Sequence, residues 1–157
     1  EFGNKIKFIL DGGQCKIGLE STIIDLTVKP TILRPGSISA EKIQKILKKK
    51  ITINNNPKKI KGPGQLKLHY SPGIPIIMNR KYPEKNQAFI SFGKKFKHGK
   101  NNFNLSKNGS LKEAANNLYK IMRKIKKRNF KSISVTQIPD IKLGRAINDR
   151  LIKASNK

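Results

Sequence analysis

The chain has no tryptophan, one cysteine, two histidines and only nine acidic residues among 157. Its single cysteine, Cys15, cannot form an intrachain disulfide, and with two widely spaced histidines it leaves no cluster of the kind that binds zinc. A reduced, cytoplasmic compartment is therefore expected. The chain also lacks an apolar run of the roughly 20 residues that a membrane helix requires, so we expect no membrane association.

The shortage of acidic residues leaves a formal net charge of +26. Such an excess by itself indicates a nucleic acid or an anionic surface as partner. Lysine supplies nearly all of the charge, however, and it is spread over every segment with few aromatic residues between for base stacking. Abundant Lys, Ile and Asn together are typical of coding DNA rich in A and T. Composition favours a solvated surface with weak, salt-sensitive RNA binding, and a basic non-catalytic RNA-binding module is the alternative function.

Hydrophobic periodicity predicts an α/β fold. Three strand-like runs and a short helix capped by Ser39 come first, followed by a lysine-rich segment with the composition of a linker. The remainder alternates strands with helices, which predicts right-handed crossovers and a small, mainly parallel sheet. The expected strands are 5–10, 21–26, 30–33, 74–79, 87–92 and 132–138, the later helices are 110–125 and 144–154, and 94–109 is expected to be a loop.

Two motifs carry residue types that bind ligands. Residues 11–36 read DGGQCKIGLESTIIDLTVKPTILRPG, and residues 62–72 read GPGQLKLHYSP. Arg34, at a strand end, offers a charged fork suited to phosphate, or it forms a surface ion pair. The hydroxyl of Ser21 can bind a substrate oxygen, or it satisfies backbone groups at a strand start. His69 can hydrogen-bond a phosphate or ribose, or it is an exposed loop residue.

The motifs DGG, GLESTIIDLT, ILRPG, HYSP and GRAINDRLIKAS, in this order, resemble the long form of the L-threonylcarbamoyladenylate synthase family, which is related to YrdC. The similarity covers about residues 5–155 and is most specific in the first 72. It implies an enzyme that joins L-threonine, bicarbonate and ATP into threonylcarbamoyl-AMP and pyrophosphate, with Mg²⁺ by analogy. A downstream transfer machinery would use the product to modify tRNA, which is thus an indirect partner.

The resemblance also assigns roles to individual residues. It implies that Ser21 lies against L-threonine and that Arg34 and His69 contact ATP, while no residue receives a catalytic or metal-binding role. Four neighbours are carried over only as supporting residues: Glu20, Thr22, Gly64 and Tyr70.

The same resemblance divides the chain into three parts. We expect residues 1–50 to be the C-terminal part of a twisted, YrdC-like catalytic domain, 51–73 a linker that forms a lid, and 74–157 a small Rossmann-like accessory domain. The family's Lys-x-Arg and Ser-x-Asn nucleotide-binding elements would precede residue 1, and no such pair appears downstream. We therefore expect the isolated chain to be inactive. A carbamoyl-transfer relative of hydrogenase maturation shares the YrdC-like fold, but the linker and terminal domain fit it poorly.

Overall fold

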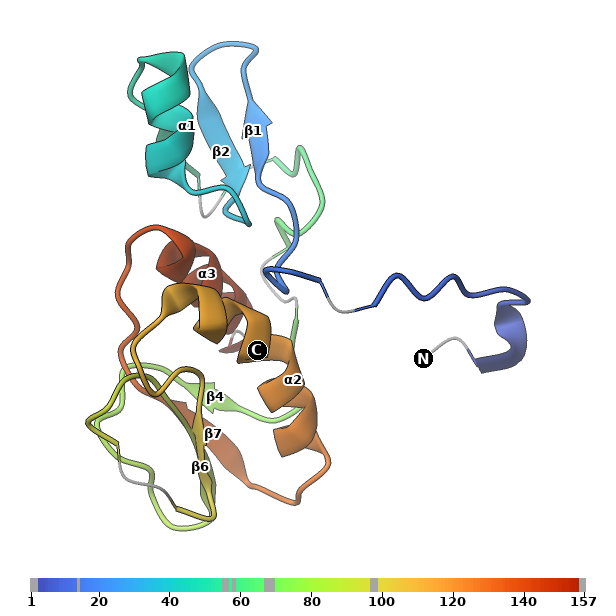
Figure 1. Cartoon of the computed structure of the whole chain (residues 1–157), viewed down its shortest axis with the longest axis vertical. Helices are drawn as coiled ribbons and strands as arrows, with labels where there is room; N and C mark the ends of the chain where they lie inside the picture. Colours follow the sequence, from blue (N-terminus) through green and yellow to red (C-terminus); the bar gives the residue numbers. More distant parts are fainter. Residues whose placement is uncertain are drawn as a thin grey trace.

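The computed structural model describes residues 3–13, 15–54, 57, 59–66, 70–96 and 99–155. Within them the strands form two separate sheets, one of three strands and one of four. Figure 1 shows the three-stranded sheet and α1 at one end of the molecule, and the four-stranded sheet with α2 and α3 at the other. The α/β class predicted from the sequence is confirmed.

The smaller unit is an antiparallel hairpin extended by a third strand that runs parallel to the second. Its buried core is small and consists of Ile32, Ala40 and Ile51. The helix begins where the Ser39 hydroxyl accepts a hydrogen bond from a backbone N–H in the first turn, as the sequence predicts. The elements are β1 (Ile23–Asp25), β2 (Thr31–Arg34), α1 (Ala40–Leu47) and β3 (Thr52–Ile53).

The larger unit is a parallel sheet in the order β4-β7-β5-β6, packed against two helices. It contains the main core, in which Ile90, Leu118, Ile133 and Leu151 are completely buried. Every residue of β5, one of the two inner strands, is buried. The elements are β4 (Ile76–Ile77), β5 (Gln87–Ser91), β6 (Asn102–Asn104), α2 (Leu111–Lys126), β7 (Ser132–Val135) and α3 (Leu143–Ser155).

Ser110 followed by Glu113 three residues later predicts a capping box at the start of α2, and this cap is present in a modified form. The Ser110 hydroxyl accepts a hydrogen bond from the Glu113 backbone N–H. The Glu113 carboxylate does not reach back to the Ser110 N–H directly. Instead the Ser106 hydroxyl accepts from that N–H and donates to the Glu113 carboxylate at 2.5 Å. A third side chain therefore completes the capping box.

The structure corrects two expectations and adds a strand inside the lysine-rich segment. Residues 5–10 do not form a strand: Gly3–Lys5 is a 3₁₀ turn, and the following stretch lies exposed beside no strand of the described chain, so it has no ladder to join. The expected loop 94–109 contains β6, which the polar sequence Asn-Phe-Asn concealed. Strand β3 falls within 51–73 and pairs with β2 through its backbone.

Candidate functional site

Ser21 and Arg34 are brought together by the β1–β2 hairpin. The register places Arg34 opposite Ile23, two residues after Ser21. The Arg34 guanidinium donates from Nε and Nη2 to the Ser21 carbonyl at 3.1 and 3.0 Å, and from Nη2 to Ser21 Oγ at 3.1 Å. Among the residues that the structure describes, the hydrogen bonds of this guanidinium come from Nε and Nη2 and none comes from Nη1. The arginine is a fixed donor rather than a mobile surface cation, as phosphate recognition requires.

Glycine is required where β2 leaves this pair. A Cβ on Gly36 would lie 2.5 Å from the carbonyl oxygens of Glu20 and Ser21, which is too close for any side chain. The neighbouring Ser37 N–H donates to the Glu20 carbonyl at 3.0 Å. The two ends of the hairpin thus approach backbone to backbone, and this close approach sets the position of Ser21.

The linker lies against the same arginine. Gly64 has a positive φ of 77°, and a Cβ there would lie 2.9 Å from Arg34 Cδ and 2.9 Å from the Tyr70 hydroxyl. Gln65, which is buried, accepts from the N–H groups of Lys61 and Gly62 and donates to the Leu33 carbonyl. This side chain, which sequence reasoning did not single out, ties the linker to β2.

Substitution of Gly64 by alanine is expected to displace Arg34 and Tyr70 in addition to straining the backbone. Gly73 is a matched control, because its φ is also 77° but no atom lies within 4 Å of an added Cβ. We expect each variant to lose roughly 1 kcal/mol of unfolding free energy from the left-handed conformation. Only Gly64→Ala should shift the NMR signal of Arg34 Nε–H. Equal spectra for the two variants would contradict this packing.

Glu20 bridges the two units. Its carboxylate accepts from the Tyr119 hydroxyl of α2 at 3.0 and 3.2 Å and from Arg150 Nε of α3 at 3.0 Å. The Arg150 side chain is completely buried, whereas the Glu20 side chain is 33% exposed. Sequence reasoning missed Tyr119 and Arg150 as site residues. The only signal for Arg150 was its place in the Ala-Ile-Asn-Asp-Arg run.

Tyr70 completes this contact from the linker. Its backbone has a φ of 64°, an uncommon value for a residue with a side chain. Its ring lies 5.0 Å from the Arg150 guanidinium carbon and 5.9 Å from the Tyr119 ring. Burial, together with the charge of Glu20 and a hydrogen bond to it, raises the pKa of Tyr70 despite the nearby arginines. The residue is held at the junction of the hairpin, the linker and the larger unit.

The Glu20 contacts should make stability depend on pH. Burial alone would raise the pKa of Glu20, but the Arg150 charge and hydrogen bonds from its own backbone, Arg150 and Tyr119 lower it below its ordinary value of 4.5. A carboxyl with a depressed folded pKa stabilises the fold above its unfolded pKa, and this contribution is lost as the pH falls through the folded value. The free energy of unfolding, measured with urea, should therefore fall more steeply below pH 4.5 for the wild type than for Glu20→Gln. Parallel pH profiles would exclude this role.

Thr22 and His69 are two other predicted site residues, and in the described structure the hydrogen bonds of Thr22 do not involve Ser21 or Arg34. The Thr22 hydroxyl donates to the Ile38 carbonyl at 2.6 Å and accepts from the Ile38 N–H at 3.1 Å, so both its donor and its acceptor are used by the backbone of Ile38. His69 lies outside the described residues.

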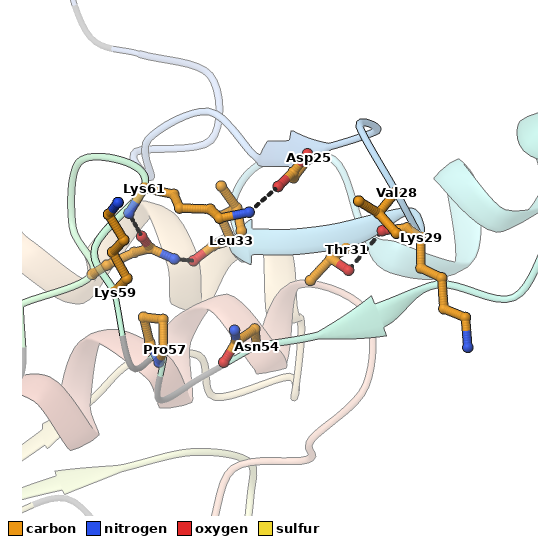
Figure 2. A pocket seen from close by; sticks show the side chains of 10 residues that line it. Asp25, Val28, Lys29, Thr31, Leu33, Asn54, Pro57, Lys59 and Lys61 are labelled. Carbon is orange, nitrogen blue, oxygen red and sulfur yellow. Dashed lines mark hydrogen bonds and ion pairs between the residues drawn. The ribbon is translucent and has the colours of Figure 1, made fainter.

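A cavity of about 360 Å³ lies elsewhere, between β2 and the linker. Figure 2 shows Lys29, Lys59 and Lys61 around it, with Lys61 paired to Asp25 at 3.0 Å. Hydrogen bonds from the Thr27 hydroxyl and N–H, followed by Lys61, hold the pKa of Asp25 far below its usual range. Neither Ser21 nor Arg34 lines this cavity, so it is not the predicted site.

No group of three or more His, Cys, Asp or Glu side chains that could hold a metal ion occurs among the described residues. Glu20 and Asp25, the carboxylates nearest the hairpin, are already engaged by cations and hydroxyl groups. No helix in the described part of the chain is long and apolar enough to cross a membrane.

These features define a two-unit α/β protein in which a glycine-bounded hairpin presents a fixed arginine to a linker. A family model described as threonylcarbamoyl-AMP synthase, C-terminal domain, matches residues 38–156, and the chain belongs to this family. A second family model, described as telomere recombination, matches residues 1–36.

Similar proteins match almost the whole chain. Threonylcarbamoyl-AMP synthase of Pyrococcus abyssi is 31% identical over 99% of this chain and 51% of its own length, and that of Bacillus subtilis is 27% identical over 99% and 50%. The crystal structure of P. abyssi Sua5 complexed with L-threonine superimposes with a TM-score of 0.83 at 30% identity, covering 99% of this chain and 51% of that one. The chain thus spans about half the length of the curated relatives it matches.

A variant structure of the same archaeal protein matches too. It carries alanine in place of a histidine and the following tyrosine, and it superimposes with a TM-score of 0.69 at 26% identity over 97% of this chain and 47% of that one.

Proposed function

We propose that this chain supplies one wall, the lid and the accessory domain of a threonylcarbamoyl-AMP synthase. In this proposal residues 1–50 belong to the catalytic domain, 51–73 form the lid, and 74–157 form the accessory domain. The reaction consumes L-threonine, bicarbonate and ATP and releases threonylcarbamoyl-AMP and pyrophosphate. The product would pass to a transfer machinery that acts on tRNA in the cytoplasm.

The observation that carries the proposal is the Arg34 guanidinium, which Ser21 holds in place against Gly64 of the linker. In the reaction, bicarbonate and the threonine amine condense to a carbamate with loss of one water molecule. A carbamate oxygen then attacks the α-phosphorus of ATP, and the bond to the departing pyrophosphate breaks. Negative charge grows on the departing phosphates and must be met by oriented donors. Arg34 would donate to them from Nη1, and Ser21 Oγ, on an exposed residue, would contact L-threonine.

The relatives support the same assignment. One solved relative is named as a complex with L-threonine, and another carries a paired histidine and tyrosine substitution. His69-Tyr70 is the one His-Tyr pair in this sequence. We therefore propose that His69 contacts ATP and that Tyr70, Glu20, Thr22 and Gly64 support the site. ATP would carry its own Mg²⁺.

The test combines this chain, by fusion or mixing, with an N-terminal YrdC-like portion and measures pyrophosphate release. We expect the combined protein to release pyrophosphate only when ATP, bicarbonate and L-threonine are all present, and we expect this chain alone to release little. Omission of L-threonine is the matched control. A folded complex that releases no pyrophosphate would overturn the proposal. If RNA binding then disappeared with added salt and did not change on substitution of Arg34, the alternative of a basic RNA-binding module would be favoured.

A further inference from the structure

Arg150 occupies a position that the proposed reaction does not by itself explain. It projects from α3 of the larger unit, yet its guanidinium touches the residue before Ser21 and the residue after His69. Nε and Nη2 both lie 3.0 Å from Glu20 Oε2, and the ring of Tyr70 lies 5.0 Å from the guanidinium carbon. One buried side chain therefore contacts both the wall and the lid of the proposed site.

The charges around Arg150 are balanced. Asp149, also buried, accepts from Arg150 Nη1 at 2.5 Å and pairs with Lys153 at 2.6 Å. Glu20 and Asp149 thus face Arg150 and Lys153, two charges of each sign. Burial alone would lower the pKa of Arg150, but Glu20, the two tyrosines and Asp149 raise it on balance. Arg150 therefore stays charged.

We infer that Arg150 is a positioning residue that couples the lid to the threonine-binding wall across the boundary between the two units. The wall is coupled because Glu20 precedes Ser21 in the chain. The lid is coupled because Tyr70 stacks on the guanidinium and its hydroxyl lies beside Gly64, which in turn faces Arg34. Loss of the contact between Arg150 and Glu20 would therefore also loosen Tyr70, and loss of the contact with Tyr70 would loosen Glu20. This inference rests on the proposed function for the identity of the site, but its structural part does not.

The geometry uses the planar shape of arginine and not only its charge. The guanidinium presents two nitrogens of one edge to Glu20 and a third to Asp149, while its face meets Tyr70. Lysine could retain one ion pair but could not stack in this way. The conservative change Arg150→Lys therefore keeps the positive charge but removes the stacking and the second contact on which the coupling depends.

Amide hydrogen exchange on this chain tests the coupling without catalysis. Lys61 and Gly62 report on the linker, because their N–H groups bond to Gln65, and Ser37 reports on the wall, because its N–H bonds to the Glu20 carbonyl. The amides of Phe89 and Ile133, bonded within the larger unit, report on its fold. We expect Arg150→Lys and Glu20→Gln each to speed exchange of the linker and wall amides about tenfold and to leave the reference amides unchanged.

Arg145→Gln is the matched control. Arg145 also projects from α3 and pairs across the units, with Glu41 of α1, but it contacts neither Glu20 nor Tyr70 in the described structure. Arg145→Gln should leave the exchange rates of the Lys61 and Gly62 amides at their wild-type values. Linker exchange that stays at the wild-type rate, or that rises only in step with the reference amides, would overturn the coupling. If Arg150→Lys does not fold, Glu20→Gln decides the question alone.

Kinetics supply the second readout once a synthase has been reconstituted. Arg150→Lys should raise KM for both L-threonine and ATP, about tenfold each, since wall and lid loosen together. A change in kcat with both KM values constant would contradict the coupling. Failure to reconstitute activity would count against the proposed function and would leave the exchange result standing.

Discussion

Replacement of Arg34 by alanine is expected to slow pyrophosphate release by a reconstituted synthase about 10²–10³-fold, the usual cost of losing one oriented donor to developing charge. The guanidinium is already held by three hydrogen bonds to Ser21, so it needs no reorganisation when phosphate arrives. Arg34→Lys keeps the charge but loses the fork, and we expect it to recover only part of the rate. The measurement is steady-state pyrophosphate release at saturating L-threonine.

The control for this change is Arg80→Ala, which removes the same charge from an exposed position in the larger unit. It should release pyrophosphate at the wild-type rate. If Arg34→Ala kept more than half of the wild-type rate, Arg34 would be a structural residue that anchors Ser21, and the ATP-binding assignment would fall.

Replacement of Arg150 by methionine is expected to lower the free energy of unfolding by about 3–5 kcal/mol, the typical cost of removing one member of a buried ion pair. Methionine fills similar space but removes this cation from both Glu20 and Asp149, and only Asp149 keeps Lys153 as a partner among the described residues. The Asp149 side chain is only 4% exposed, so water cannot replace the lost donor. Urea unfolding monitored by circular dichroism measures the change.

Arg145→Met provides the comparison on the same helix. The Arg145–Glu41 pair is much more exposed, at 29% and 41% of the two side chains, and exposed pairs contribute about 0–1 kcal/mol. A loss for Arg150→Met no larger than that for Arg145→Met would mean that the buried network contributes little net stability.

The sequence predicted those parts of the fold that local signals specify. Ser39 and Ser110 mark the starts of α1 and α2 because their hydroxyls cap the first turn, and the glycine at position 36 marks the end of the hairpin. The contact of Ser21 with Arg34 was not predicted, and it follows from the antiparallel pairing of β1 with β2. Strand β6 was also missed because a single phenylalanine between two asparagines has no detectable alternation, and its pairing with β5 is a tertiary effect.

The remaining partners of the site could not be predicted for a different reason. Tyr119 and Arg150 lie 99 and 130 residues beyond Glu20, and no local pattern connects them. An arginine flanked by Asp149 on an amphipathic helix ordinarily faces solvent. Its surroundings here are set by tertiary contacts with Glu20 and Tyr70, which lie far from it in the sequence.

The distribution of the core has a consequence for the way the chain is made. The hairpin and α1 precede α2 and α3 in the sequence, and among the described residues the buried core of the smaller unit consists of Ile32, Ala40 and Ile51. The groups that bind Glu20 come later in the sequence, in α2 and α3. Glu20 can therefore form these contacts only after both helices have been synthesised.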